Sequence, residues 1–240
     1  YEASKMPLKF FLKFFQNHGL FKLKNRPQWF TVAKRSRTYV AKVLSSISGE
    51  YYKNYNVNRL IRRSNGIDLY YGDKSEFFSY DKVVLASHAD QALSIIDEPT
   101  KEEQEILSKF KYRENIAVIQ TDESIMPNNK DIWSSWNSSV DKNNVENNSI
   151  TYWVNLLQNL DFNKNIFLTL NPNFKINEDN ILKKVNFTHP YFDQSALDNQ
   201  DKLKNLQNKK NLLFCGSYFG YGFHEDGIKS SIEMIKAIDD

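Results

Sequence analysis

Four of the eight glycines in this 240-residue chain lie close together near its end, at Gly216, Gly220, Gly222 and Gly227. They separate a short apolar run at 211–216 from a final helical pattern. Glycine lets the backbone approach a flat or charged ligand without an intervening side chain. A helix start adds unpaired N–H groups and a partial positive charge. The pattern indicates a turn that faces an anion or the polar edge of a ring; the alternative is a tight surface turn with a glycine cap.

His224 precedes the final helical pattern, where a side chain that titrates near neutral pH could tune a bound ring or carry a proton. Its alternative role is to cap the helix or to pack on the turn. The other histidines, His18, His88 and His189, are scattered, and Cys215 is the single cysteine, so no zinc-ligand spacing occurs. The Gly-x-Ser-x-Gly pattern of serine hydrolases is missing as well. A zinc enzyme and a serine hydrolase therefore have no support in the sequence.

The elements that must position this turn alternate between helices and short strands. Leu8, Phe11, Leu12 and Phe15 form an apolar stripe at helical spacing. Helical patterns cover 7–19, 36–48, 90–96, 100–111, 195–207 and 226–238. Short β-rich runs cover 56–63, 67–71, 75–80, 82–87, 115–122, 132–139, 149–157, 166–172 and 211–216.

Turn signals separate several of these runs. Asn65-Gly66 and Gly72-Asp73 predict hairpin turns, and the Asn-rich stretch 141–148 predicts a surface turn. The run at 82–87 is continuously apolar, as expected for a strand that is buried on both faces.

Composition is typical of a soluble globular protein, with 40% apolar residues, 25% charged residues and a net charge of +3. That charge is too small to indicate nucleic-acid binding. One cysteine excludes an intrachain disulfide, and no apolar run approaches the roughly 20 residues of a membrane span. No signal-peptide pattern is visible, and we expect a cytoplasmic protein.

Residues 1–37 carry nine Lys or Arg and one acid, Glu2, interleaved with Phe and Leu. Such a stretch is typical of a surface that contacts a membrane and admits a lipid substrate. The alternative is a solvated helix face whose other side joins the core.

Ten stretches resemble the flavin-containing amine oxidase superfamily, and in particular its predicted NAD/FAD-binding oxidoreductases that are often found with cyclopropane-fatty-acid synthases. In the family's order they are FFQNHGL, RPQWFTV, SRTYV, DKVVLASHADQAL, TDESIMP, WSSWN, TYWVNLLQ, TLNP, HPYFD and FCGSYFGYGFHEDGIKSS. The resemblance covers nearly the whole chain, and the stretches are specific jointly rather than singly. It implies a mixed α/β (α+β) fold that combines a partial FAD-binding domain with a mixed-sheet substrate domain.

The resemblance also assigns parts of the chain to these domains. Residues 50–96 would be a β-meander piece of the FAD domain, and 208–240 its C-terminal strand and helix. Residues 97–207 would form the substrate domain, and 1–49 a helical segment between the two.

Carried over residue by residue, the resemblance implies that FAD is the cofactor. The backbone of Val57 would meet the adenine, and Ala86 and Ser87 would pass near the pyrophosphate. Gly216 and Ser217 would lie against the ribityl chain.

The same resemblance places the start of the last helix against the flavin. Glu225, Asp226 and Gly227 would meet the pyrimidine edge of the ring, with His224 in contact or nearby. Backbone N–H groups at that helix start would stabilise negative charge on the reduced flavin. The residues expected to line a substrate cavity are aromatic: Tyr218, Phe219, Tyr221 and, from the second sheet, Trp153.

Two departures from the family pattern matter. The Gly-x-Gly-x-x-Gly turn that holds the FAD pyrophosphate does not occur in this sequence. Lys34 and Arg35 stand where the family usually has two glycines, which puts a close backbone approach to the cofactor there in doubt. We therefore expect the C-terminal portion of a longer flavoprotein, inactive by itself.

The function that the resemblance implies is an FAD-dependent oxidoreductase of amine-oxidase type, which transfers a hydride from substrate to flavin. The substrate would be an amine or a fatty-acyl or related lipid. The alternative is a non-catalytic remnant, or a protein-binding module that lacks the cofactor site. The sequence leaves the oligomeric state open.

Overall fold

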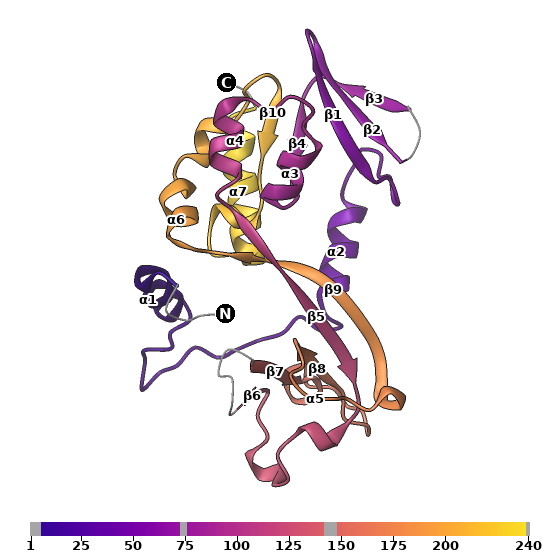
Figure 1. Cartoon of the computed structure of the whole chain (residues 1–240), viewed down its shortest axis with the longest axis vertical. Coiled ribbons are helices and arrows are strands. Elements are labelled where there is room, and N and C mark those ends of the chain that lie inside the picture. The colour runs from indigo at the N-terminus through magenta and orange to yellow at the C-terminus, as the bar shows by residue number, and fades with distance from the viewer. Residues whose placement is uncertain (1–5, 73–75, 142–147, 239–240) are drawn as a thin grey trace. The chain divides into compact units, whose positions relative to one another are not determined.

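The computed structural model describes residues 6–72, 76–141 and 148–238 (Figure 1). The described residues form two compact units, and we treat each by itself. The larger unit comprises residues up to 112 together with 190 onward, and the smaller unit comprises 113–189.

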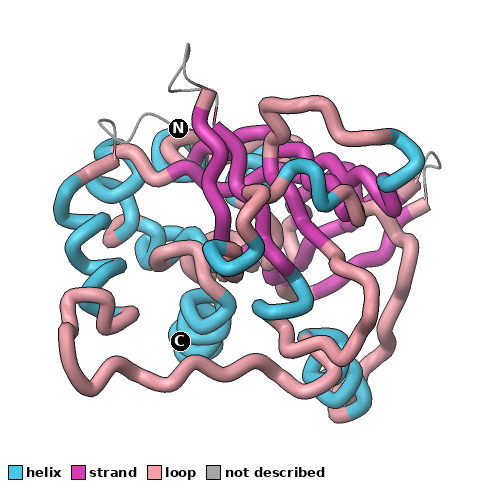
Figure 2. The backbone as a smooth tube through the Cα atoms, turned by 90° about the horizontal axis from the view of Figure 1, so that it is seen from below, coloured by secondary structure: helices cyan, strands magenta, loops and turns pink. Residues whose placement is uncertain are grey.

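The larger unit contains most of the helices of the chain and two of its sheets. Its helices are α1 (Leu8–Asn17), α2 (Ser36–Ser45), α3 (Ala89–Ile95), α4 (Lys101–Leu107), α6 (Gln194–Gln200) and α7 (His224–Lys236), with short 3-10 turns at η5 (Leu203–Leu206) and η6 (Ser217–Phe219). Its strands are β1 (Val57–Arg63), β2 (Gly66–Tyr71), β3 (Phe77–Tyr80), β4 (Val83–Leu85) and β10 (Leu212–Phe214). In Figure 2 the stretch between α1 and α2 is a long loop.

Strands β1, β2 and β3 form an antiparallel sheet in that order. A hairpin turn is present where Asn65-Gly66 predicted one, but its two loop residues are Ser64 and Asn65, because Arg63 pairs with Gly66, the first residue of β2. The second predicted turn, at Gly72-Asp73, extends beyond the described residues, as does most of the predicted turn at 141–148.

Strands β4 and β10 form a separate parallel pair, with Val83 opposite Leu212 and Leu85 opposite Phe214. All three residues of β10 are buried, and in β4 only Val84 is exposed. Burial on both faces is what parallel strands require, and it explains why their sequences read as continuous apolar runs.

One hydrophobic core holds this unit together. Ile106 and Leu107 of α4 are buried in it together with Leu203, Leu206 and Phe214. The smaller unit, 113–189, is narrower than the range 97–207 predicted for the substrate domain, because 97–112 and 190–207 belong to the larger unit. The described part of the segment 1–49 belongs to the larger unit as well.

The smaller unit is built on a five-stranded sheet with the order β6-β7-β8-β5-β9. Its elements are β5 (Lys111–Gln120), η2 (Glu123–Ile125), η3 (Lys130–Ile132), β6 (Trp136–Val140), β7 (Asn148–Trp153), α5 (Val154–Leu157), β8 (Phe167–Leu170), η4 (Glu178–Asn180) and β9 (Ile181–Tyr191). Strand β7 pairs antiparallel with β6 and with β8, and β8 pairs antiparallel with β5.

Two strand predictions in this unit were inaccurate. The run expected at 132–139 begins as the turn η3, because Asn129 accepts the N–H of Asp131 over 3.0 Å, and β6 starts only at Trp136. The strand β9 was missed altogether. None of its residues is buried, so its sequence shows no apolar alternation.

Candidate functional site

The two parallel strands end side by side, and the sequence-predicted site residues follow directly. Ala86 and Ser87 come after β4, while Cys215 and Gly216 come after β10. The N–H of Cys215 donates to the carbonyl oxygen of Leu85 over 3.1 Å, which continues the pairing past the strand ends. In parallel sheets, ligands bind outside the carboxyl ends of the strands. The structure thus brings two predicted pieces of the cofactor site to one edge.

A cavity of about 610 Å³ opens beside β4. The three residues predicted to meet the nucleotide half of FAD, Val57, Ala86 and Ser87, all line it. The full lining is Asn56, Val57, Asn58, Leu69, Val83, Val84, Leu85, Ala86, Ser87, Gln91, Ser94 and Ile95. None of these side chains is charged, so the cavity suits a neutral group with hydrogen-bonding edges better than a phosphate.

The cavity follows the open edge of β4 rather than one of its faces. Consecutive strand residues point to opposite faces, yet Val83, Val84 and Leu85 all line it. Among the described residues, β10 is the only strand that pairs with β4, so the opposite edge of β4 lies along the cavity.

The glycine turn is shaped by its own packing. Gly216 has φ 153°, and a Cβ there would lie 2.8 Å from the ring of Tyr218 and 3.4 Å from the carbonyl oxygen of Ser87. Gly222 has φ 92° and lies against the ring of Phe192. Both positions require glycine for conformation and space, whether or not a ligand approaches.

Asp226 stabilises this turn through hydrogen bonds with its backbone. Its Oδ2 accepts the N–H groups of Tyr221 and Phe223, each over 3.0 Å. The carboxylate also occupies the space where Gly220 would carry a Cβ. Asp226 therefore fixes the entry into α7, and neither it nor any other residue of 216–227 lines the cavity.

The neighbours of Asp226 have other contacts. Glu225 forms an exposed ion pair with Lys229 at 3.4 Å. The Nδ1 of His224 lies 2.7 Å from the hydroxyl of Tyr39, which joins α2 to the first residue of α7. Sequence reasoning missed Tyr39, because no local pattern links residues that are 185 positions apart.

Gly227 differs from the other glycines of the turn, Gly216, Gly220 and Gly222, because the packing of the protein does not require glycine there. A Cβ there would meet only the backbone N of Ser217, at 3.8 Å, an ordinary contact. Gly227 lies in the first turn of α7, where alanine is the better helix former. The packing of the protein therefore leaves room for a side chain at Gly227.

The predicted substrate-cavity residues are distributed differently from the expectation. Tyr218 is wrong as a cavity residue: it is 2% exposed and packs on Phe110 and Phe219, because its ring turns inward beneath Gly216. Burial raises the pKa of Tyr218 well above its usual range. Phe219 is partly buried against the same core. Trp153 belongs to the smaller unit, where its Nε1 donates to Asn165 over 2.9 Å.

Tyr221 is the predicted residue that joins a wider aromatic cluster. Its ring lies 5.1 Å from Phe10 of α1, and burial, followed by the charge of Asp226, raises its pKa. Phe223, the next aromatic of the turn, lies 5.9 Å from Phe14 and 5.2 Å from His18. We call these five side chains the aromatic cluster.

The aromatic cluster corrects the sequence interpretation of α1. The helix turns Phe10, Phe14 and His18 toward the turn, whereas Leu8 and Leu12 of the predicted apolar stripe are exposed. The spacing of residues 10, 14 and 18 was the signal that could have identified the inward face.

Lys34 and Arg35, which stand where the resemblance leads us to expect two glycines, both have positive φ. Their φ angles are 61° and 68°, and ψ of Arg35 is −175°, a region that side chains disfavour. Helix α2 begins at the next residue, Ser36.

Comparisons with known proteins show which solved structures share the fold of this chain. No family model matches the chain, and no curated protein matches it in sequence. Among solved structures, a CLA-producing fatty acid isomerase from P. acnes matches with a TM-score of 0.57 at 13% identity, over 84% of this chain and 51% of that chain. A double mutant of putrescine oxidase, redesigned in its cofactor binding, matches with a TM-score of 0.57 at 8% identity, over 86% of this chain and 53% of that chain.

A protein assigned as a protoporphyrinogen oxidase from Exiguobacterium sp. 255-15 matches with a TM-score of 0.60 at 9% identity, over 96% of this chain and 58% of that chain. The chain thus spans only about half the length of these proteins. It shares a mixed helix-and-sheet fold with these three proteins.

Proposed function

We propose that this chain contributes the adenosine side and the flavin-edge turn of an FAD-dependent oxidoreductase of amine-oxidase type. The observation that carries the proposal is the uncharged cavity at the carboxyl end of β4, which gathers Val57, Ala86 and Ser87. The shared fold with oxidases of this type supports it.

The residues present fit the nucleoside half of FAD. The volume of about 610 Å³ lies within the usual range of small-ligand sites. Asn58, Gln91 and Ser94 offer amide and hydroxyl groups for adenine and ribose, and Leu69 and Ile95 offer apolar contact. The phosphates would need donors from outside this lining, because it holds no Lys or Arg.

The open helix start fits the flavin edge. Gly216 and Ser217 would lie along the ribityl chain, and the N–H groups of Glu225 and Asp226 would face the ring. The N–H of Gly227 instead donates to the carbonyl oxygen of Phe223 over 3.2 Å. The observation in favour is that a Cβ at Gly227 would meet only the backbone N of Ser217, at 3.8 Å. FAD supplies hydride acceptance from a substrate carbon when bound, and this chain's residues orient it and exclude water.

For the substrate we favour an apolar or acyl group over a small amine. The aromatic cluster lies beside the start of α7, and both carboxylates there are engaged: Asp226 by backbone N–H groups and Glu225 by Lys229. An ammonium group would need a free carboxylate or an open aromatic cage. Structural neighbours include both a fatty acid isomerase and an amine oxidase, so the fold is compatible with either class.

The nucleotide assignment is tested by titrating the ¹⁵N-labelled chain with AMP, FMN and FAD. We expect AMP and FAD to shift the amides of Val57 and Ser87, and FMN to leave them in place. Ser87→Leu should weaken AMP binding at least about tenfold by filling the cavity, whereas Ser108→Leu, exposed at the end of α4, should not. Shifts with FMN at the same amides, or no shift with any of the three, contradict the assignment.

The redox assignment needs the protein as its natural gene encodes it. Anaerobic bleaching of bound flavin is followed with two panels, short amines and acyl lipids. Reduction by amines alone would contradict the apolar preference. A natural protein that binds AMP but carries no flavin would support the non-catalytic alternative.

A further inference from the structure

A basic surface runs through the N-terminal part of the larger unit. The described residues 6–49 contain nine Lys or Arg and no Asp or Glu. Since the chain carries +3 overall, the residues outside this stretch hold six more acids than bases. The nine cations are Lys9, Lys13, Lys22, Lys24, Arg26, Lys34, Arg35, Arg37 and Lys42, and among the described residues none forms an ion pair with a carboxylate. We refer to 8–43 as the basic surface.

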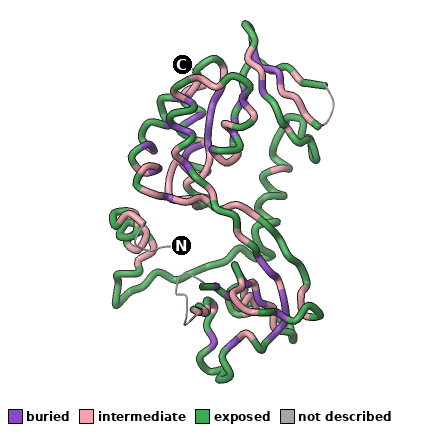
Figure 3. Tube along the Cα trace, in the orientation of Figure 1, coloured by how far each residue is buried: buried purple, intermediate pink, exposed green. Residues whose placement is uncertain are grey.

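The same surface exposes large apolar side chains, and α1 carries such side chains on two faces. Phe10 and Phe14 belong to the aromatic cluster and are covered in part. On the other side Phe11 contacts Phe15 at 4.2 Å, and Phe15 contacts Phe21 of the following loop at 5.4 Å. An apolar strip therefore leaves the helix and continues into the loop, whose residues are almost all exposed (Figure 3).

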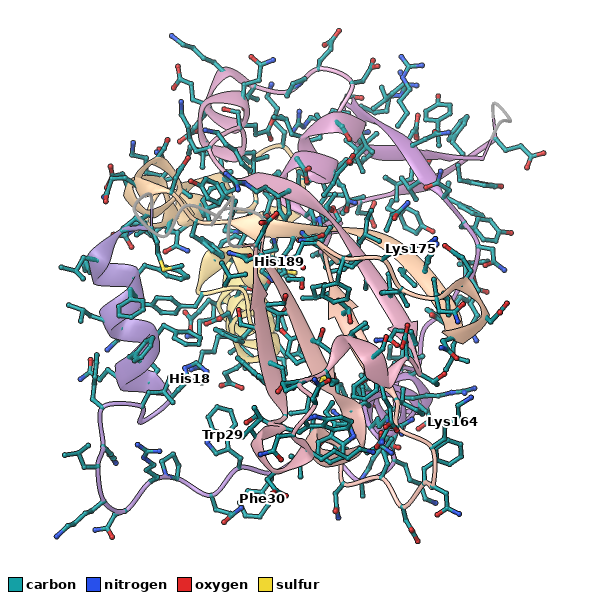
Figure 4. The ribbon with its side chains drawn as sticks, turned by 60° about the horizontal axis from the view of Figure 1, so that its bottom comes forward. His18, Trp29, Phe30, Lys164, Lys175 and His189 are labelled. Atoms are coloured by element: carbon teal, nitrogen blue, oxygen red, sulfur yellow. The ribbon has the colours of Figure 1, made fainter. Side chains whose placement is uncertain are left out.

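The loop between α1 and α2 exposes its apolar residues most strongly. Leu23 is 90% exposed, Phe30 89% and Trp29 63%. Figure 4 shows Trp29 and Phe30 on this loop, with Trp29 on the side of His18, on which it stacks at 6.0 Å. Large apolar side chains exposed together on one loop are typical of an interaction site.

The composition of the surface favours a lipid bilayer over a protein partner. Protein interfaces are depleted in Lys, whereas six of these nine cations are Lys. Lys and Arg beside Trp, Phe and Leu are typical of segments that lie in the interface of an anionic membrane. In the part of the chain that the structure describes, no helix has the length and apolarity needed to cross a bilayer. The surface can therefore lie on a membrane through α1 and its loop.

We propose that the basic surface docks the protein on an anionic bilayer. Leu23, Trp29 and Phe30 enter the headgroup region, and the cations, which form no ion pair with a carboxylate of the described residues, contact lipid phosphates. This inference does not depend on the proposed redox function, since it concerns lipid binding by the surface alone.

Co-sedimentation with vesicles tests the proposal. Phosphatidylcholine vesicles are compared with vesicles that also contain phosphatidylglycerol, using the 240-residue chain. We expect binding to the anionic vesicles only, with weakening at high salt because exposed charges are screened. Brominated lipid should quench Trp29, and that part of the quenching should be lost in Trp29→Phe. Equal binding to both vesicle types, or binding to neither at low salt, overturns the proposal.

Charge variants distinguish binding through the basic surface from a general effect of the protein's net charge. Lys22→Gln, Lys24→Gln and Arg26→Gln together should weaken binding about 100-fold, since each cation near an anionic surface contributes a factor of about five. The matched control is Lys164→Gln, Lys175→Gln and Lys183→Gln, three exposed cations of the smaller unit with the same change in charge. An equal loss in both triple variants contradicts a specific surface.

Substitution of two exposed apolar residues provides a second, independent test of membrane binding. Leu23→Ser with Phe30→Ser should weaken vesicle binding by more than tenfold without a change in the melting temperature, because both side chains are solvent-exposed in the folded protein. Ile132→Ser with Leu182→Ser, both exposed in the smaller unit, is the control. The membrane proposal is wrong if the wild type binds no vesicles and forms oligomers that the Leu23→Ser, Phe30→Ser variant does not form. The surface would then bind another polypeptide chain.

Discussion

The side-chain amide of Gln207 pairs with the backbone of Phe214 at both of its polar groups. Its Nε2 donates to the Phe214 carbonyl oxygen over 2.8 Å, and its Oε1 accepts the Phe214 N–H over 3.0 Å. This contact satisfies the outer edge of β10 in the way that a neighbouring strand would. The parallel pair is therefore closed at β10, and its other edge, at β4, lies along the cavity.

Gln207→Ala should lower the free energy of unfolding of the larger unit by about 2 kcal/mol, because two buried backbone groups lose their partners. Urea denaturation followed by far-UV circular dichroism measures this, since nearly all helices belong to the larger unit. Gln104→Ala, exposed on α4, is the matched control and should change stability by less than about 0.5 kcal/mol. A similar effect of the two substitutions would contradict the edge-closing role of Gln207.

Tyr218→Phe should raise stability by about 1 kcal/mol or leave it unchanged, because the buried Tyr218 hydroxyl has no hydrogen-bond partner among the described residues. Tyr112→Phe is the contrasting variant: its hydroxyl accepts the N–H of Ala89 over 3.0 Å, and burial raises the pKa of Tyr112 to about 12. Its loss should cost about 1 kcal/mol. Thermal melts of both variants decide the point, and a clear destabilisation by Tyr218→Phe would contradict it.

Arg35→Gly should stabilise the chain by about 1 kcal/mol, because glycine adopts the φ of 68° without strain. Arg37→Gly lies within α2 and should destabilise by about 1 kcal/mol, since glycine is a poor helix former. The two variants remove the same charge two residues apart. A difference in the sign of the change in melting temperature therefore reports the effect of glycine on the backbone conformation rather than the loss of charge. The strain assignment fails if both shift in the same direction.

Asp122 links the strand end of β5 to a neighbouring loop in the smaller unit. Its Oδ1 accepts the N–H and hydroxyl of Ser124 over 3.0 and 2.6 Å, and its Oδ2 accepts the N–H of Asn177 over 3.1 Å. The Ser124 hydroxyl first, and then the two backbone N–H groups, lower the pKa of Asp122 below its ordinary value.

Asp122→Ala should therefore destabilise the smaller unit by about 2 kcal/mol at pH 7. A carboxyl with a lowered folded-state pKa stabilises fully above its unfolded pKa of about 4 and loses that contribution as the pH falls through the folded value. The difference between wild type and variant should stay constant from neutral pH down to about pH 5 and narrow below about pH 4. Tryptophan fluorescence in a Trp29→Phe background reports this unit, which holds the other three tryptophans, Trp133, Trp136 and Trp153. Exposed Asp131→Ala is the control. A difference between wild type and variant that grows as the pH falls would contradict the predicted sign.

The sequence by itself determined the local elements around the candidate site. The apolar runs at 82–87 and 211–216 predicted buried strands, and the parallel pair of β4 and β10 lies within them. Gly216 and Gly222 predicted a turn, and in the structure both have positive φ. These features depend on residues close in sequence, and local sterics and periodicity record them directly.

Tertiary packing decided which side chains this turn exposes. Glycine spacing suggested that Tyr218 would be open, but Phe110 lies 5.3 Å from its ring and the core encloses it. In α1 the choice between two apolar faces depended on Phe192, Tyr221 and Phe223, far along the chain. The cavity depends on an unpaired strand edge, a property of sheet order that no single stretch of sequence carries. Such contacts join residues about a hundred or more positions apart, and because their energy depends on the assembled core, local patterns cannot report them.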